Sequence, residues 1–339
     1  MTDPAERVEE RVESFSQILG RAEESAALLV VDELRIFEFL MPGPATLEEL
    51  ATRASVAPRR LSAFLDQVVA LGFLEREQER YRLVDGDREL FDPEGTHREG
   101  LGQSDLQRYF GRMGGTLDVL RSDRSLVAAG SGGSSNAEQR RQFMRYLHSR
   151  SVVAADEVAE LLCTEPVRHF ADLGCGLGTY SVALASRALD ATGVLVDRPN
   201  GCDPVLEFLA ESGMTERLEF LGGDFLLDDF GDGFDLVVAS NILHVLDPDR
   251  NRSLIRRAAE SLAPGGRLAL KDIAIDDDRL GPPSAVRFRM AMARFSDGGN
   301  LYSKAVVGQW LGEAGLQPDE AIDLEVASGS WLIVARRRP

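Results

Sequence analysis

Residues 167–197, VRHFADLGCGLGTYSVALASRALDATGVLVD, decide the fold of this chain. An apolar run ends at Leu173 and opens into the glycine-rich loop 174–178, GCGLG, which a helical segment follows. A second apolar run then ends at Asp197. Glycines at such a position let the backbone turn tightly and approach a ligand closely. The stretch therefore predicts a strand, a ligand-binding loop, a helix and a second strand.

The spacing of the loop bears on what it binds. Gly174, Gly176 and Gly178 form a G-x-G-x-G pattern, and Thr179 stands where a dinucleotide fingerprint has its third glycine. A pyrophosphate needs the G-x-G-x-x-G form at the start of a helix. Asp172 leads the loop, and an acidic residue there suits a cationic ligand instead. The other interpretation is a glycine-rich turn of an unrelated α/β protein.

Short apolar runs continue to alternate with helical segments down the rest of the chain. The runs are RLEFLGGD (217–224), FDLVVAS (234–240), GRLALKDIAI (266–275) and GSWLIVARR (329–337). This alternation predicts an α/β fold with a mainly parallel, doubly wound sheet covered on both faces. Ligands of such sheets bind at the carboxyl ends of the strands. Asp197 and Asp224 both follow predicted strands, so we expect them at that edge.

The first hundred residues follow another pattern. Apolar positions at helical spacing predict two helices over 7–40, and Thr46 with Glu49 forms a capping box for a third. A fourth helix over 58–73 precedes a charged hairpin, 74–84, which completes a winged-helix pattern. Such a module binds DNA or serves dimerisation and packing. The fourth helix is apolar over most of 61–69, which favours dimerisation or packing.

Composition and charge limit the classes of partner. The chain has 339 residues, of which 44% are hydrophobic, and a net charge of −18. Because neutralisation of phosphates by cations dominates nucleic-acid affinity, we expect no nucleic-acid partner. No apolar run is long enough for a membrane span, and the charged start has no apolar signal-peptide core. We therefore expect no membrane partner and a cytoplasmic location.

Cysteine and histidine usage bears on disulfides and metals. Cys163, Cys175 and Cys202 are sparse, odd in number and without C-x-x-C spacing, so we expect free thiols. The four histidines and the acidic residues show no metal-ligand spacing, so we expect no metal.

The loop and the strand-end carboxylates together resemble the class I S-adenosyl-L-methionine (SAM)-dependent methyltransferases, whose first motif is acidic-x-G-x-G-x-G. The resemblance implies a Rossmann-like catalytic domain whose loop, led by Asp172, wraps the methionine and ribose parts of SAM. Asp197 would accept hydrogen bonds from both ribose hydroxyls. Asp224 would meet the adenine amino group, Phe225 would pack on the ring, and Ser240 would complete the cofactor site. Turn capping is the alternative role for Asp224.

The stretch from FDLVVASNILHVL to LAPGGRLAL, 234–270, narrows the resemblance. It is similar to the O-methyltransferases of plant and bacterial secondary metabolism, which carry a winged-helix-like dimerisation domain. The resemblance implies a homodimer that methylates a small-molecule acceptor on a hydroxyl group. It also implies three regions: a dimerisation domain (1–100), a helical linker and acceptor-pocket region (101–163) and a SAM-binding catalytic domain (164–339).

In that family a histidine after the fourth strand is the general base, and His244 occupies its position. A base that titrates near neutral pH assists attack by a neutral hydroxyl by roughly 10²- to 10⁴-fold. The family's following aspartate is Val245 here. One orienting carboxylate remains as Asp272, and the second falls near Asn300-Leu301, which cannot replace it. The alternative role for His244 is packing at a helix start.

Each residue that would line the acceptor pocket has core packing as an alternative role. The candidates are Tyr109, Met113, Met144, His148, Met290 and Arg294. Together they would make an apolar pocket with a few polar points. Two other functions stay open: a C- or N-methyltransferase or other SAM-binding enzyme of this fold, and a non-enzymatic regulator with a ligand-sensing domain.

Overall fold

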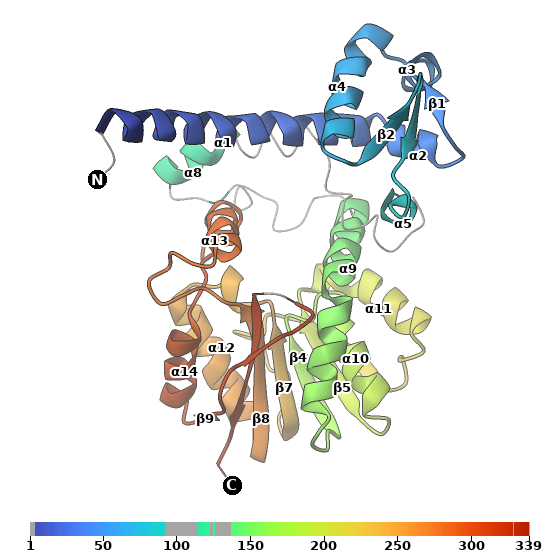
Figure 1. The fold of residues 1–339 in the computed structure, drawn as a ribbon. Coiled ribbons are helices and arrows are strands. Elements are labelled where there is room, and N and C mark those ends of the chain that lie inside the picture. The colour runs from blue at the N-terminus through green and yellow to red at the C-terminus, as the bar shows by residue number, and fades with distance from the viewer. Residues whose placement is uncertain (1–3, 92–113, 123–124, 126–136, 328, 339) are drawn as a thin grey trace. The chain divides into compact units, whose positions relative to one another are not determined.

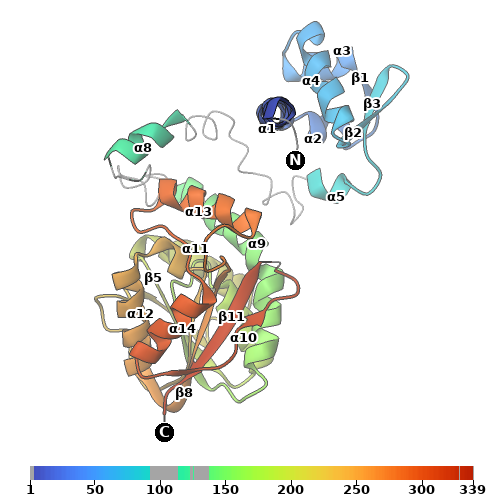
Figure 2. The same ribbon diagram turned by 60° about the vertical axis from the view of Figure 1, so that its left-hand side comes forward.

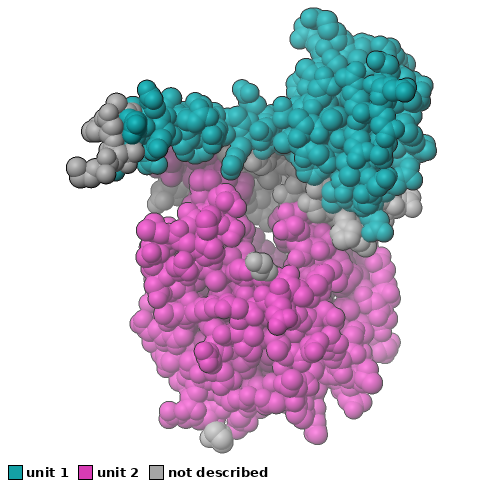
Figure 3. Space-filling model, in the orientation of Figure 1, with its two compact units in different colours: residues 1–114 teal, residues 115–339 magenta. Residues whose placement is uncertain are grey.

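The computed structural model describes residues 4–91, 114–122, 125, 137–327 and 329–338. It divides the chain into two compact units, residues 1–114 and 115–339, coloured separately in Figure 3. The long helix α9 (Ala137–Leu162), which the sequence placed in the linking region, belongs to the second unit. Within the described residues, every helix is too short or too polar to cross a membrane.

The first unit has the winged-helix pattern that the sequence predicts. Arg35 takes a left-handed conformation (φ 58°) and separates the first two helices. The Thr46–Glu49 capping box is present, and the hairpin gains a third strand. The elements of this unit are α1 (Pro4–Glu33), α2 (Ile36–Leu40), β1 (Ala45–Thr46), α3 (Leu47–Ala54), α4 (Pro58–Ala70), β2 (Leu74–Glu77), β3 (Arg80–Leu83) and α5 (Arg88–Phe91).

Helix α4 uses its apolar face for the core of the first unit. Leu61, Leu65 and Val68 are buried, whereas Arg59 and Arg60 at its start are exposed. These three residues pack with Phe37 and Tyr81 in one cluster. Most of the face that the sequence assigned to packing is therefore core, but Phe64, which was assigned to it as well, is 37% exposed.

The second unit contains the predicted doubly wound sheet (Figure 1). Strands β6, β5, β4, β7 and β8 are parallel in that order, and β11 is antiparallel beside β8. The strands are β4 (His169–Leu173), β5 (Thr192–Asp197), β6 (Leu218–Gly222), β7 (Phe234–Ser240), β8 (Leu262–Ile273), β9 (Gln317–Pro318), β10 (Ile322–Asp323) and β11 (Ser330–Arg336). Every apolar run that the sequence singled out contains one of these strands.

Helices cover both faces of this sheet. One buried cluster joins α9, α10 and α11 to one face, and another joins α12 and α14 to the opposite face. The helices of this unit are α8 (Thr116–Ser122), α9, α10 (Thr179–Arg187), α11 (Cys202–Glu211), α12 (Pro248–Ser261), α13 (Pro283–Phe295) and α14 (Lys304–Glu313), with short 3₁₀ turns η1 (Pro199–Gly201) and η2 (Leu243–Val245).

The direction of the sheet topology reverses at the centre of the carboxyl edge. Strand β4 pairs with β5 on one side and with β7 on the other, so the chain winds in opposite directions from this point. Ligands of doubly wound sheets bind at such a switch point. Helix α13 lies beyond the carboxyl ends of the parallel strands (Figures 1 and 2).

Candidate active site

The glycine loop after β4 takes a conformation that only glycine accepts readily. Gly174, Gly176 and Gly178 all have positive φ, of 75°, 58° and 88°. A Cβ on Gly174 would lie 2.9 Å from Ile242, and one on Gly178 would lie 2.9 Å from Leu195. A Cβ on Gly176 would meet nothing within 4 Å. The loop is thus packed at both ends and leaves open space against its middle.

Asp172 lies beneath this loop at the end of β4. Its side chain is 1% exposed, and Oδ2 accepts a hydrogen bond from Ser181 Oγ at 2.6 Å. Burial raises the pKa of the carboxyl from 3.8 to about 7, against the opposing effect of the Ser181 hydroxyl. Asp172 therefore connects the end of β4 to helix α10, and its carboxyl group supports the loop from below.

Asp197 ends β5 and holds the loop from the other side. Its Oδ2 accepts a hydrogen bond from the amide of Gly176 at 2.8 Å, and Oδ1 accepts one from Arg198 N at 2.7 Å. Burial raises the pKa of this carboxyl, although both amide donors act in the opposite direction. The two carboxylate oxygens thus lie at the open middle of the loop, where the sequence predicts the ribose.

Asp224 is the residue that the structure uses for a turn. Its Oδ1 accepts a hydrogen bond from Leu226 N at 2.9 Å, and its own amide donates to Asp228 Oδ2 at 2.8 Å. Phe225 is half-buried and packs against the core cluster of α12 and α14. The turn-capping role is therefore present, and adenine contacts by Asp224 and Phe225 remain a proposal.

A series of side-chain hydrogen bonds connects β8 to α10, and the sequence did not predict it. Lys271 Nζ donates to Asn241 Oδ1 at 2.8 Å, and Asn241 Nδ2 donates to Tyr180 Oη at 3.4 Å. Burial lowers the pKa of Lys271 and raises that of Tyr180. Beside Lys271 in the sheet, Ser240 Oγ is buried and has no hydrogen-bond partner within the described part of the chain. The signal in the sequence is the charged pair Lys271-Asp272, which directly follows the apolar residues 268–270 of β8.

His244 and Asp272 meet at the carboxyl ends of β7 and β8. His244 Nδ1 lies 2.7 Å from Asp272 Oδ1, and the amide of His244 donates to Oδ2 at 3.2 Å. Burial alone would raise the pKa of Asp272, but His244, the amide of Ile273 and Lys271 together lower it. An ionised carboxylate accepts, so Nδ1 carries the hydrogen and Nε2 is the basic nitrogen of the ring.

The segment that carries His244 is held in place by residues 288–302. Asn300 N donates to His244 O at 3.1 Å, and Ser296 Oγ donates to Val245 O at 2.7 Å. Tyr302 Oη donates to the carbonyl of Leu246 at 2.7 Å. The ring of Phe288 meets the His244 ring edge to face, with centroids 5.0 Å apart. These contacts fix the backbone of the histidine without the aspartate that Val245 replaces.

Of the six predicted acceptor residues, the structure describes four, and these lie on the two helices α9 and α13. Tyr109 and Met113 lie outside the described residues. His148 Nδ1 lies 3.0 Å from Thr179 Oγ1 and its ring meets Phe208, so it packs at the start of α10. Met144 packs beside Gly201 on the same face of α9. On α13, Met290 is exposed, and Arg294 lies over the ring of Phe295. Contacts of these residues with an acceptor remain a proposal.

The residues present fit SAM. The open space at Gly176 gives room for a ligand against the loop, Asp197 presents two acceptor oxygens beside it, and the buried Ser240 hydroxyl is a polar atom that a ligand can pair. Asp172, Asp197 and the loop carry negative or neutral groups, which suit a sulfonium cation. Fold and site together define a class I SAM-dependent methyltransferase.

Comparisons with known proteins specify the family. The profile of an O-methyltransferase domain matches residues 127–317, which is more than half of the chain, and that of an O-methyltransferase dimerisation domain matches residues 17–86. The chain belongs to the O-methyltransferase family, and it is an enzyme that uses S-adenosyl-L-methionine. The resemblance read from the sequence is thereby confirmed, and the second match agrees with the dimerisation role of the winged-helix-like region.

Similar proteins include two from Streptomyces. The 3-hydroxy-5-methyl-1-naphthoate 3-O-methyltransferase of Streptomyces sahachiroi is 29% identical over 297 residues, which cover 84% of this chain and 83% of that protein. The N,N-dimethyltransferase OxyT of Streptomyces rimosus is 28% identical over 349 residues, covering 95% of each chain. Among solved structures, an O-methyltransferase family protein from Burkholderia thailandensis superposes with a TM-score of 0.86 at 22% identity, covering 96% of this chain and 98% of that one.

Proposed function

We propose that this enzyme methylates a hydroxyl group of a small, hydroxylated secondary metabolite, with His244 as general base. The observation that carries the proposal is the His244–Asp272 pair, joined at 2.7 Å beside the switch point of the sheet. The Streptomyces sahachiroi relative is named for methylating a hydroxynaphthoate, which supports a hydroxylated aromatic ring as the acceptor.

The chemistry follows from the residues. A neutral hydroxyl is a poor nucleophile, and its attack develops positive charge on oxygen unless a base removes the proton. SAM, when bound, supplies an electrophilic methyl group. Nε2 of His244 takes the proton of the hydroxyl, and Asp272 stabilises the positive charge that results on the ring. The contacts of Asn300, Ser296 and Phe288 keep the ring from turning away, which preserves the alignment that displacement needs.

Product analysis tests this function. The full-length protein is incubated with SAM and a panel of hydroxylated aromatic compounds, and S-adenosylhomocysteine is quantified. Mass spectrometry and NMR then locate the new methyl group. We expect an aryl methyl ether. Transfer to nitrogen or carbon would instead support the second class of function, which the relative OxyT represents.

Asp197 is expected to bind the ribose of the cofactor, so Asp197→Ala should weaken S-adenosylhomocysteine binding. Unpaired buried partners cost about 1–3 kcal/mol, which corresponds to roughly 5- to 150-fold in affinity. Calorimetry measures the loss, and Asp190→Ala, an exposed aspartate, serves as the control.

Because Asp197 also holds Gly176 N, a second measurement separates the two roles. A ribose contact makes the wild type discriminate against the 2′-deoxy analogue of S-adenosylhomocysteine, and the variant should lose this discrimination. If both proteins discriminate equally between S-adenosylhomocysteine and its 2′-deoxy analogue, Asp197 supports the loop and does not bind the ribose.

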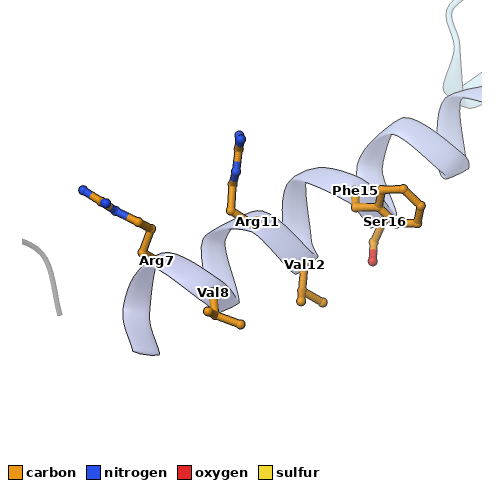
Figure 4. A pocket seen from close by; sticks show the side chains of 6 residues that line it. All are labelled: Arg7, Val8, Arg11, Val12, Phe15 and Ser16. Carbon is orange, nitrogen blue, oxygen red and sulfur yellow. The ribbon is translucent and has the colours of Figure 1, made fainter. Parts of the chain in front are cut away.

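We further propose that the enzyme is a homodimer in which α1 meets a second copy. Four apolar side chains lie at helical spacing on one side of this helix, where Figure 4 shows Val8 and Val12 projecting together. Val8, Val12, Phe15 and Leu19 are 62%, 61%, 64% and 55% exposed. The dimerisation-domain match covers residues 17–86, so it includes Leu19 and begins just after the other three residues. Exposed apolar stripes of this kind mark protein interfaces.

The double variant Val12→Asp/Phe15→Asp should therefore be monomeric. Two charges in an apolar interface are costly to bury, and the exposed positions tolerate them in the free chain. Light scattering gives the mass of the wild type and the variant. Ser14→Asp adds a charge at another exposed position of the same helix and should stay dimeric. A dimer in the double variant would place the interface elsewhere.

A further inference from the structure

Helix α13 turns an arginine toward the segment that carries His244. Ala285, Phe288, Met292 and Ser296 share one face of this helix, and each is buried, packed in the neighbouring apolar cluster or bonded to the His244 segment. At 100° per residue, Arg289 falls on the same face. Its Nε donates to Asn300 Oδ1 at 2.8 Å, and Asn300 N donates to His244 O at 3.1 Å. One residue thus links the guanidinium to the backbone of the proposed base.

The charge of Arg289 has no counter-ion in the described part of the chain. A guanidinium has five N–H donors, and the hydrogen bond to Asn300 uses only the one on Nε. The half-buried side chain forms no ion pair there, although the protein carries 56 acidic residues against 38 basic ones. The two terminal nitrogens keep the geometry that binds a carboxylate with two parallel hydrogen bonds.

Asn300 explains why the positive charge of Arg289 has no counter-ion in the described part of the chain. The sequence places a neutral amide near the point where the family has its second orienting carboxylate. A carboxylate there would pair with Arg289 and cancel its charge. The amide instead fixes the guanidinium through Nε and leaves its positive charge uncompensated.

We propose that Arg289 binds a carboxylate of the acceptor, so that the enzyme selects aromatic hydroxy acids over neutral phenols. This inference rests on the proposed methyl transfer at His244 and names its substrate class.

Matched pairs of acid and ester test the proposal. Salicylate, 3-hydroxybenzoate and 3-hydroxy-2-naphthoate, and the methyl ester of each, are titrated into the full-length protein saturated with S-adenosylhomocysteine. Calorimetry gives the affinities. We expect at least one acid to bind roughly tenfold or more tightly than its ester, and Arg289→Met to remove the difference. Arg289→Lys should keep part of it. Arg287→Met, an exposed arginine on the opposite face of α13, should leave it unchanged.

Asn300→Asp provides an independent variant that keeps the arginine. The new carboxylate should pair with Arg289 and lower the acid-to-ester ratio toward one, while thermal denaturation shows a folded protein. Equal binding of acids and esters by the wild type, or no binding of any acid, overturns the proposal. A loss of S-adenosylhomocysteine affinity in Arg289→Met with an unchanged acid-to-ester ratio also overturns it, because the cofactor's own carboxylate would then be the ligand.

The same panel separates this inference from the proposed function. Methylation of neutral phenols without preference for acids leaves the function standing and refutes the role of Arg289. Acid binding that depends on Arg289, without O-methylation of any compound, supports the anion site and refutes the function.

Discussion

Replacing His244 with glutamine is expected to lower kcat by roughly 10²- to 10⁴-fold on a hydroxyl acceptor, because only the proton transfer is lost. Glutamine keeps a polar side chain that can donate to Asp272, which is ionised and buried. The affinity for S-adenosylhomocysteine should therefore stay that of the wild type. With Val245 in place of the family's aspartate, we expect a loss at the lower end of the range.

The pH dependence distinguishes a base from a packing residue. The deficit of the variant should shrink as pH rises through the pKa of the acceptor, because a phenolate formed in solution needs no base. His169→Gln is the matched control, since His169 lies at the opposite, amino end of β4. Equal pH–rate profiles for wild type and His244→Gln would remove His244 from catalysis. A loss of stability with unchanged kcat per folded molecule would assign it to packing.

Asp172→Asn is expected to stabilise the cofactor-free protein at neutral and alkaline pH. Burial raises the pKa of Asp172 from 3.8 to about 7, so the folded protein binds a proton that the unfolded chain releases. One pKa unit corresponds to about 1.4 kcal/mol, so this difference is worth at most roughly 4 kcal/mol. Asparagine is neutral, has nearly the same shape and can still accept the hydrogen bond from Ser181.

The sign follows from proton binding. Between about pH 4 and pH 7 the folded state holds more protons at Asp172 than the unfolded state, so the wild type loses stability as pH rises through this window. Below the window both states are protonated, and the variant has no advantage. Urea denaturation at pH 4, 5.5, 7 and 8 measures the difference, and Asp190→Asn at the surface should leave the slope unchanged. A variant that parallels the wild type across this range would mean that Asp172 is ionised in the folded protein.

Local chemistry determined most of the fold. Strand and helix periods, the Thr46–Glu49 capping box and the spacing of Gly174, Gly176 and Gly178 depend on residues close in the chain, and each appears in the structure as predicted. The hand of each strand–helix–strand crossover is also set locally, because such units are right-handed in nearly every protein. For that reason the sequence predicted both the α/β architecture and the edge at which the ligand site lies.

The roles of single site residues could not be predicted from local sequence where their partners lie far away in the chain. The expectation that Asp272 orients His244 came from family resemblance, whereas the 2.7 Å contact across 28 residues is a product of the folded sheet. Asp224 looked the same in sequence as Asp197, yet one caps a turn and the other holds the loop. Strand-end position alone does not distinguish them, because the difference depends on what packs above each carboxylate.

The sequence by itself predicted the class of fold and the glycine-rich loop proposed to bind the cofactor, and the family resemblance added the pair of residues proposed for proton transfer. Only the tertiary structure decided the burial that raises the pKa of Asp172, the chain from Lys271 through Asn241 to Tyr180, and the pairing of Arg289 with Asn300. These properties arise where separate elements meet at the carboxyl edge of the sheet. Desolvation and long-range hydrogen bonds act through space, so no local pattern of residue types encodes them.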